Sequence, residues 1–325
     1  MKFYRVFAFF FLCFCIAFTF VFGAKKINEG KSLSTNSEYT GILTLWHVET
    51  FEGGEGSRRQ FLLKIAREFE KEYPGLLVYV TTHTANSLKE NFSKQIYPDI
   101  ISYGNGIEVQ NLVELYGEFN CVGGMFGDKI LAIPWCRGGY FLIDNPLIKN
   151  DNNDCLVSNS EFNVPILALM GFSEKLELKE SSQYGAYLEF VNGKCKYLLG
   201  TQRDIVRLTN RGMNFNATPI ETFNDLYQYV SIIRKDDLKV NSSRAFVEYL
   251  LSERSQKKLN SINMFSDFFD VEFDVEIMSK MQKIKKFSTI SSFNSAKIFY
   301  DLKELSLGAY SGNDEKFIKL KKFII

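Results

Sequence analysis

The 325-residue sequence contains little histidine, tryptophan or proline and no excess of charge of either sign. It has 2 His, 2 Trp and 6 Pro, and 39 Lys and Arg stand against 38 Asp and Glu. Because a net charge of +1 offers no surplus of cations for phosphates, nucleic acid is not expected as a partner. Neither His47 nor His83 lies in a recognisable nucleophile motif, so hydrolysis through serine or cysteine is poorly supported.

Cysteine is also scarce, and its spacing argues against a zinc site. Cys13 and Cys15 lack the small preceding residues that a lipidation site requires. The other cysteines have no CxxC spacing, so no metal and no cofactor is predicted. One or two disulfides and buried free thiols both stay open for these four residues: Cys121, Cys136, Cys155 and Cys195.

The first 23 residues predict export. Lys2 and Arg5 form a basic start, and residues 6–23 are an almost unbroken apolar stretch. Cleavage at the end of this stretch and retention as a membrane anchor both stay open, because its length nearly suffices to span a bilayer. Lipidation at Cys13 or Cys15 stays open as a third alternative, although the small preceding residues are missing. The polar residues 24–39 suit a flexible tether. We expect the protein at the extracellular face of the cell membrane or in the periplasm.

The next part of the chain predicts a βαβ unit. Residues 42–45 and 76–81 are short apolar runs typical of strands. Between them a helix is expected to begin at Ser57, with Gln60 completing a capping box. Apolar residues recur every four positions from Phe61, which gives this helix one buried face. A strand, a helix and a strand in this order indicate parallel pairing in an α/β lobe.

Further elements follow along the rest of the chain. We predict a strand at residues 99–103, helices at 109–116 and 183–192, and a strand at 195–199 that leads into a loop. After Pro219 the predicted elements are mostly helices. These cover residues 244–252, 253–262, 275–284, 295–307 and 314–323.

Five stretches together resemble one known family. They are LTLWHVETFEGGEGSRRQFLLKIAREFEKEYPGLLVYV, YPDIISYGNG, LAIPWCRGGYFLIDN, YGAYLEFVNGKCKYLLGTQRDIVRL and SSRAFVEYLLSERSQKKLNSINMFS. Their order and spacing resemble the extracellular solute-binding proteins of ABC importers, in the maltose- and sugar-binding group. Two features depart from the family pattern: Asp144-Asn145 stands where Tyr-Asn is usual, and the segment between Asn145 and Tyr184 is short.

The resemblance implies a type 2 periplasmic-binding fold. This fold is α/β and two-lobed, each lobe being a mostly parallel sheet flanked by helices, and here C-terminal helices are added. Lobe one would comprise residues 40–138 and 231–264, and lobe two residues 139–230 and 265–325. The family function is that of a monomeric receptor, not an enzyme. Such a receptor captures a small solute, here a carbohydrate, by hinge closure and delivers it to an ABC transporter permease.

The loop after the first predicted strand carries three glutamates, Glu49, Glu52 and Glu55, among three glycines. It contains neither GxxxxGK[ST] nor GxGxxG, so phosphate binding by a glycine loop is not expected. Glycoside hydrolysis needs two carboxyl groups that face each other across a sugar, whereas these three share one loop. Ligands bind beyond the carboxyl ends of parallel strands, which is the position of this loop.

We predict a ligand site in which aromatic rings stack on sugar faces and polar groups meet hydroxyls. Trp46, Tyr103 and Trp135 each lie at the end of a predicted strand and are the candidate stacking residues. The candidate polar residues are His47, Glu49, Glu52, Asn105 and Arg137 in lobe one, with Gln202 and Arg203 in lobe two. Core packing of both tryptophans and solvent exposure of the glutamates stay open as alternative interpretations.

Two other functions also stay open. If the glutamates point into the cleft, a polyamine or another cationic solute would be preferred to a neutral sugar. The short segment between Asn145 and Tyr184 suggests a reduced second lobe. A non-transport envelope sensor or interaction protein with a binding-protein fold is therefore a further alternative.

Overall fold

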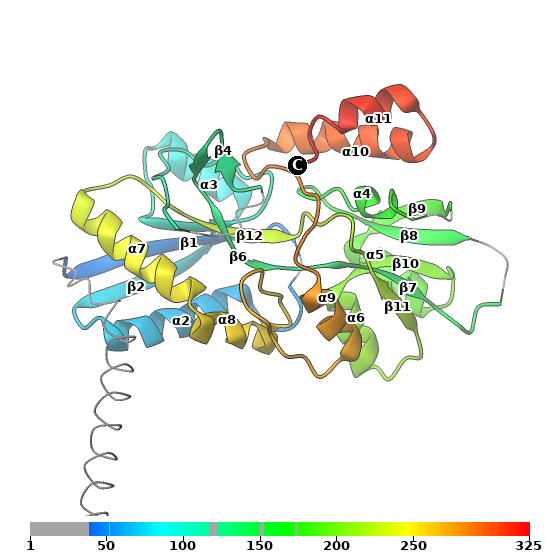
Figure 1. Cartoon of the computed structure of the whole chain (residues 1–325), viewed down its shortest axis with the longest axis horizontal. Helices are drawn as coiled ribbons and strands as arrows, with labels where there is room; N and C mark the ends of the chain where they lie inside the picture. Colours follow the sequence, from blue (N-terminus) through cyan, green and yellow to red (C-terminus); the bar gives the residue numbers. More distant parts are fainter. Residues whose placement is uncertain (1–38, 52, 118–122, 150–152, 173–174) are drawn as a thin grey trace, which may run out of the picture. The chain divides into compact units, whose positions relative to one another are not determined.

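The computed structural model describes residues 39–51, 53–117, 123–149, 153–172 and 175–325. Residues 39–325 form one compact unit, in which two five-stranded sheets lie side by side (Figure 1). The predicted export segment and nearly all of the predicted tether lie outside the described residues.

The first sheet has the strand order β2-β1-β3-β12-β6. Of these strands, β12 is antiparallel to both of its neighbours, so the other four run in one direction. The predicted strands at 42–45, 76–81 and 99–103 are confirmed as parts of this sheet. Its strands are β1 (Gly41–Val48), β2 (Leu76–His83), β3 (Ile100–Tyr103), β6 (Ile133–Arg137) and β12 (Tyr227–Ile232).

The second sheet repeats this plan with the strand order β11-β7-β10-β8-β9. Here β7 is antiparallel to both neighbours, and the other four strands share one direction. The predicted fold class, α/β with a mostly parallel sheet in each half, is therefore confirmed. The strands are β7 (Tyr140–Asp144), β8 (Asp154–Asn159), β9 (Glu177–Ser182), β10 (Tyr197–Thr201) and β11 (Asn216–Pro219); β4 (Met125–Phe126) and β5 (Lys129–Ile130) form a separate ribbon.

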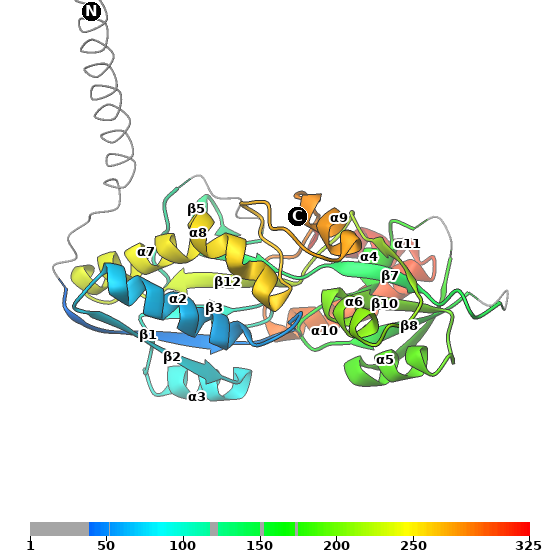
Figure 2. The ribbon, with the colours of Figure 1, turned by 90° about the horizontal axis from the view of Figure 1, so that it is seen from below.

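Helices flank both sheets. In Figure 2 the first sheet lies between α2, α7 and α8 on one side and α3 on the other, and we call this layered unit the first lobe. The second lobe is the second sheet with α5, α6 and α9 packed on its strands. The helices are α2 (Arg58–Glu72), α3 (Ala85–Ser93), α4 (Ile166–Leu169), α5 (Gln183–Val191), α6 (Gln202–Asn210), α7 (Asp237–Leu251), α8 (Glu253–Gln256), the 3₁₀ helix η1 (Lys257–Ile262), α9 (Glu276–Lys283), α10 (Ala296–Tyr310) and α11 (Asp314–Leu320).

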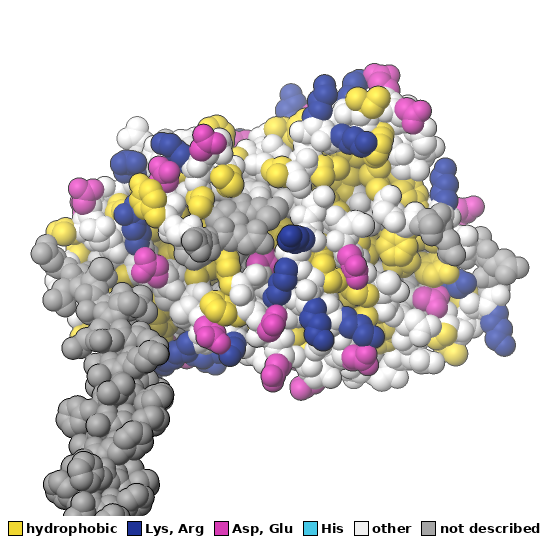
Figure 3. Space-filling view, in the orientation of Figure 1, with side chains coloured by type: hydrophobic (Ala, Val, Ile, Leu, Met, Phe, Trp, Pro, Cys, Tyr) yellow, Lys and Arg dark blue, Asp and Glu magenta, His cyan; other side chains and the backbone are white. Residues whose placement is uncertain are grey.

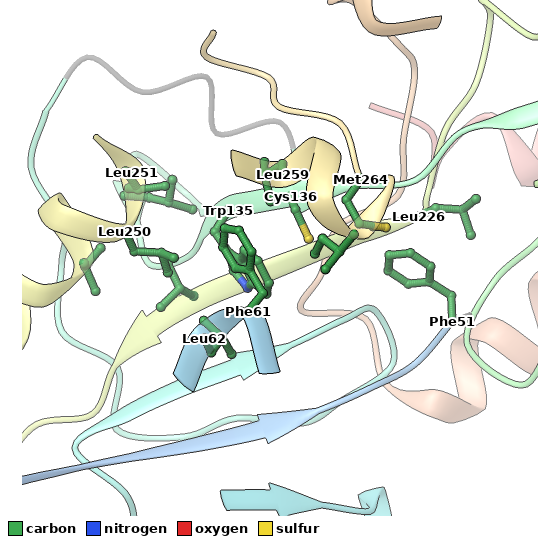
Figure 4. Packing of buried hydrophobic residues seen from close by; sticks show 14 of the residues in the cluster. Phe51, Phe61, Leu62, Trp135, Cys136, Leu226, Leu250, Leu251, Leu259 and Met264 are labelled. Atoms are coloured by element: carbon green, nitrogen blue, oxygen red, sulfur yellow. The ribbon is translucent and has the colours of Figure 1, made fainter. Parts of the chain in front are cut away.

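Helix α2 forms because its apolar residues share one face. Phe61, Ile65 and Phe69 are at most 2% exposed, and the Phe61 ring stacks on Trp135 with 5.6 Å between centroids (Figure 4). The predicted capping box is wrong: Ser57 is the N-cap, but its side chain makes no capping hydrogen bond. The start of α2 therefore keeps its backbone N–H groups unsatisfied by a side chain.

The predicted helix at residues 109–116 is also wrong. This segment contains no helix: Val113 N donates to Ile232 O of β12 at 2.9 Å, and Leu115 N donates to Ile130 O of β5 at 2.8 Å. Pairing with a neighbouring strand satisfies the backbone here, so a local helix is not needed.

Among the described residues, the chain passes from one lobe to the other three times before α9. The first passage joins β6 to β7 through residues 138–139, the second joins β11 to β12, and the third follows η1. The predicted boundary at residue 138 falls in the first passage, whereas that at residue 230 falls inside β12, all of which belongs to the first sheet. On the face drawn in Figure 3, basic and acidic side chains are interspersed and do not form a patch of one sign.

Candidate ligand cleft

A cleft of about 790 Å³ is lined by residues of both lobes. The first lobe contributes the loop that leaves β1 and the start of α2, including Glu49, Glu55 and Arg58. The second lobe contributes the residues after β8, the first residue of α5 and one side of α6. All of these segments follow the carboxyl ends of strands, as expected for a ligand site in parallel α/β sheets.

Glu49 is the centre of the first-lobe wall. Its Oε1 lies 3.2 Å from His47 Nε2 and 3.8 Å from Arg58 Nε, and its side chain is 44% exposed. The hydrogen bond from His47 and the nearby Arg58 charge lower the pKa of this carboxyl. Glu49 is therefore ionised and held in place at the cleft surface.

His47 is fully buried beneath Glu49 and has a defined tautomer. Ser102 Oγ accepts hydrogen bonds from Trp135 Nε1 at 2.9 Å and Gln228 Nε2 at 3.1 Å. Its own hydrogen must therefore go to His47 Nδ1, 3.0 Å away. His47 consequently carries its proton on Nε2 and donates it to Glu49.

The row Ser102–His47–Glu49 has the residue types of a hydrolytic triad but not its accessibility. Ser102 is 0% exposed, and both of its lone pairs already accept hydrogen bonds. A nucleophile has to reach its substrate. This row therefore holds Glu49 in position and offers no attacking oxygen to the cleft.

Arg58 lines the cleft with a nearly buried side chain, which is 2% exposed. Its Nη2 donates to Phe51 O, and its guanidinium carbon lies 4.2 Å from the centroid of the Phe51 ring. Phe51, three residues beyond β1, belongs to the same buried apolar cluster as Leu226 in the second passage between the lobes (Figure 4). Arg58 thus fixes the loop that forms the first-lobe wall.

The charged side chains that line the cleft balance among the described residues. Three carboxylates, of Glu49, Glu55 and Glu161, stand against three guanidiniums. The guanidiniums belong to Arg58, Arg203 and Arg207. The described side chains that line the cleft therefore carry no net charge.

Several solved structures similar to this chain are sugar-binding proteins. The sugar-binding protein MalE from Xanthomonas citri matches with a TM-score of 0.63 and 12% identity, over 87% of this chain and 96% of that one. Maltose-bound MalE3 of T. maritima matches with a TM-score of 0.58 and 11% identity, over 87% and 98%. The chain has the fold of the sugar-type solute-binding proteins of ABC importers.

This sugar-type fold also occurs in a protein with a different cargo. Iron-bound HitA from Pseudomonas aeruginosa matches with a TM-score of 0.54 and 13% identity, over 82% of this chain and 99% of that one. No protein-family model matches the sequence, and no curated protein is similar to it. The nature of the ligand must therefore be argued from the cleft itself.

The three aromatic residues predicted to stack on a sugar do not line the cleft. Trp46 is 9% exposed and stacks on His83, with 4.3 Å between ring centroids. Tyr103 and Trp135 are fully buried, and their polar atoms bond to Ser231 at 3.1 Å and Ser102 at 2.9 Å. All three face the layers of the first lobe, because helices cover both faces of this sheet.

Three predicted polar residues lie at the passages between lobes. Arg137 Nε pairs with Asp267 Oδ1 at 2.6 Å, and both residues are buried. Asn105 donates to Asp225 O at 2.6 Å, and Gln202 accepts from Gly139 N at 3.0 Å. None of the three lines the cleft.

Two predicted residues, Glu49 and Arg203, do line the cleft and come from opposite lobes. His47 reaches it only through Glu49, and Glu52 lies outside the described residues. Glu55 also lines the cleft, where its Oε2 accepts from Asn263 Nδ2 at 3.2 Å. The candidate residues that line the cleft therefore lie beyond the strands, Glu49 in the loop after β1 and Arg203 on α6.

Sequence reasoning missed several lining residues: Arg58, Phe162, Gln183 and Arg207. Arg58 had a signal, because basic residues at the start of a helix oppose its dipole and need a compensating anion. For Arg207 the signal was the sequence Thr201-Gln-Arg-Asp204, which forms a capping box at the start of α6.

Other sites are not found in the part of the chain that the structure describes. There, no group of three or more His, Cys, Asp or Glu side chains could hold a metal ion. Cys136, Cys155 and Cys195 are free thiols, and Cys121 lies outside the described residues. No described helix has the length and apolar content needed to cross a bilayer.

Proposed function

We propose that this protein is an exported, monomeric receptor that captures a small solute between its lobes and delivers it to an ABC transporter. The observation that carries the proposal is the 790 Å³ cleft formed by strand-end loops of both lobes. In two-lobed binding proteins, domain closure around a ligand is an established transition. The apolar N-terminal segment would attach the receptor to the membrane.

We further propose that the solute is a carbohydrate. The cleft offers carboxylate, guanidinium and amide groups, which match sugar hydroxyls as acceptors and donors. Phe51 and Phe162 add apolar surface for the faces of sugar rings. A binding role without catalysis agrees with the sealed position of Ser102.

The charge balance of the cleft argues against a polyamine. A polycation would need uncompensated carboxylates, but Glu49 already receives a hydrogen bond from His47 and lies close to Arg58. Arg203 and Arg207 on the opposite wall would repel a second cation. A carbohydrate is therefore favoured over a polyamine.

Isothermal titration with neutral sugars, acidic sugars, oligosaccharides and polyamines tests this proposal. We expect heat from at least one carbohydrate and none from spermidine or putrescine. Glu49→Gln should weaken the carbohydrate signal, whereas Lys64→Gln, an exposed change on α2 away from the cleft, should not. Absence of heat with every carbohydrate, or tight binding of a polyamine, would contradict the proposal.

A further inference from the structure

Three helices begin at the cleft. Its lining includes the first residues of α2 and α5, Arg58 and Gln183, and the second residue of α6, Arg203. The start of a helix carries a partial charge of about +0.5. These helix starts add positive potential to a cleft in which the charges of the described side chains balance. We propose, on the basis of the proposed function, that its carbohydrate ligand carries an anionic group.

The three helices differ in how many backbone N–H groups of the first turn already have a side-chain acceptor. In α5 the Ser182 side chain accepts from Gly185 N at 3.1 Å, and in α6 Thr201 and Asp204 form a capping box. In α2 the N-cap Ser57 makes no such bond, and the first turn holds no acidic residue. The start of α2 is therefore where an anion would gain most from the backbone N–H groups.

The side chain of Arg58 independently indicates an anionic group on the ligand. Among the described residues, its Nε and Nη1 have no hydrogen-bond partner although the side chain is buried. The nearest carboxylate, Glu49, is 3.8 Å from Nε, which is beyond hydrogen-bond length. A buried guanidinium with two unsatisfied nitrogens is costly, and a carboxylate or phosphate oxygen would offset that cost.

The second lobe adds guanidiniums on the opposite wall. Arg203 and Arg207 both lie on α6 and line the cleft. The guanidinium fork matches the two oxygens of a carboxylate or phosphate. An anion contacted from both lobes would favour the closed arrangement over the open one, because those contacts require both walls.

The carboxylates of the cleft do not cancel this preference. Glu49 is engaged by His47 and Arg58, and Glu55 accepts from Asn263. Glu161, in the second lobe, is left to accept from sugar hydroxyls. The anionic group of the ligand is therefore assigned to the α2 side and the ring hydroxyls to the Glu161 side.

Titration of the full-length chain with matched pairs tests the inference. The pairs are glucuronate with glucose, galacturonate with galactose, and glucose 6-phosphate with glucose; inorganic phosphate is the probe without a ring. We expect the acidic member of at least one pair to bind about tenfold more tightly, with an affinity that falls as salt rises. Comparison of the two uronate pairs with the glucose 6-phosphate pair shows whether the cleft prefers a carboxylate or a phosphate.

Variants separate the inference from the proposed function. Arg203→Gln should remove most of the preference for the acidic member, and Arg58→Gln should do the same if the variant folds. Arg59→Gln is the matched control, because Arg59 is exposed on the same helix and does not line the cleft. Equal binding of neutral and acidic members, or an unchanged preference in Arg203→Gln, overturns the inference alone. Absence of binding by every sugar overturns the proposed function.

Discussion

At the scale of single residues, the polar groups beneath the cleft are connected to one another in a defined order. Ser102 receives hydrogen bonds from Trp135 and Gln228 and donates to His47, which donates to Glu49. Each donor in this row has an acceptor, so the orientation of Glu49 at the cleft depends on a serine in the core.

Ser102→Ala should be strongly destabilising. It would leave His47 Nδ1 and the Trp135 and Gln228 donors without their shared partner, and buried unsatisfied groups cost about 1–3 kcal/mol each. We expect a loss of roughly 2–4 kcal/mol in the free energy of unfolding, measured with urea. Ser93→Ala, at an exposed serine that bonds only to Glu90 O, should change it little. Equal effects of the two changes would contradict this account.

His47 should make the protein less stable in mild acid. Burial lowers its pKa from the ordinary value of 6.5, so the unfolded chain binds a proton before the folded chain does. The free energy of unfolding from this group therefore decreases as the pH falls below about 6.5. Buried Asp225 acts in the opposite sense, because burial raises its pKa to about 6 and its contribution is lost as the pH rises through that value.

Because these two effects oppose each other, the pH dependence of the unmodified protein does not isolate the contribution of His47. Comparison with a His47 variant does. Unfolding curves between pH 5 and 7 should show a smaller decrease on acidification for His47→Gln. His83→Gln should change the slope less, because His83 is less buried. An unchanged slope in His47→Gln would exclude the role given to this histidine.

The residue-level prediction of the site was limited by the geometry of strands. Successive side chains of a strand point to opposite faces, and in the first lobe helices cover both faces (Figure 2). A position at the end of a strand therefore did not distinguish core residues such as Trp46 and Trp135 from cleft residues. Glu49 was predictable because it lies one residue beyond β1.

At the scale of elements, the sequence indicated most helices but not where each begins. The four-residue spacing of Phe61, Ile65 and Phe69 predicted α2. Helix α6 was interpreted as a loop, although Thr201 and Asp204 carry its start signal. Strand β12 was missed because its residues are buried throughout and show no alternation.

Alanine substitutions of the two N-cap residues at the cleft, Thr201 and Ser57, should have different effects on stability. Thr201→Ala removes a side-chain cap that accepts from Arg203 N and should cost about 1 kcal/mol of stability. It should also weaken ligand binding, since α6 carries Arg203 and Arg207. Ser57→Ala removes no capping bond and should leave the melting temperature nearly unchanged. A comparable loss in both variants, by calorimetry, would contradict the assigned caps.

At the scale of the whole molecule, buried polar contacts join the lobes at their passages. The Arg137–Asp267 pair connects β6 to the segment after η1, and Arg137 Nη2 also donates to Ile284 O at 2.7 Å. Asp225, in the second passage, accepts from Tyr140 at 2.7 Å and from Val164 N at 2.7 Å. These buried contacts hold the two lobes together at their passages.

Breaking one partner of the buried Arg137–Asp267 pair should be costly. Asp267→Asn would leave the Arg137 charge buried without a counter-ion, which costs about 3–5 kcal/mol. The exposed pair Lys257–Glu253 is the control, and Glu253→Gln should change stability by less than about 0.5 kcal/mol. Urea unfolding measures both. A small effect of Asp267→Asn would mean that solvent or another group compensates Arg137.

The interleaved path of the chain also sets the order in which the two sheets can be completed. The second sheet is built from residues 140–219 and is contiguous, whereas the first sheet lacks β12, the strand between β3 and β6, until residues 227–232 are present. A nascent chain that emerges N-terminus first would therefore hold β1, β2 and β3 with one unpaired edge while more than 120 further residues follow. Until β12 is present, the exposed edge of β3 has to be kept from pairing with other chains in the cell that makes this protein.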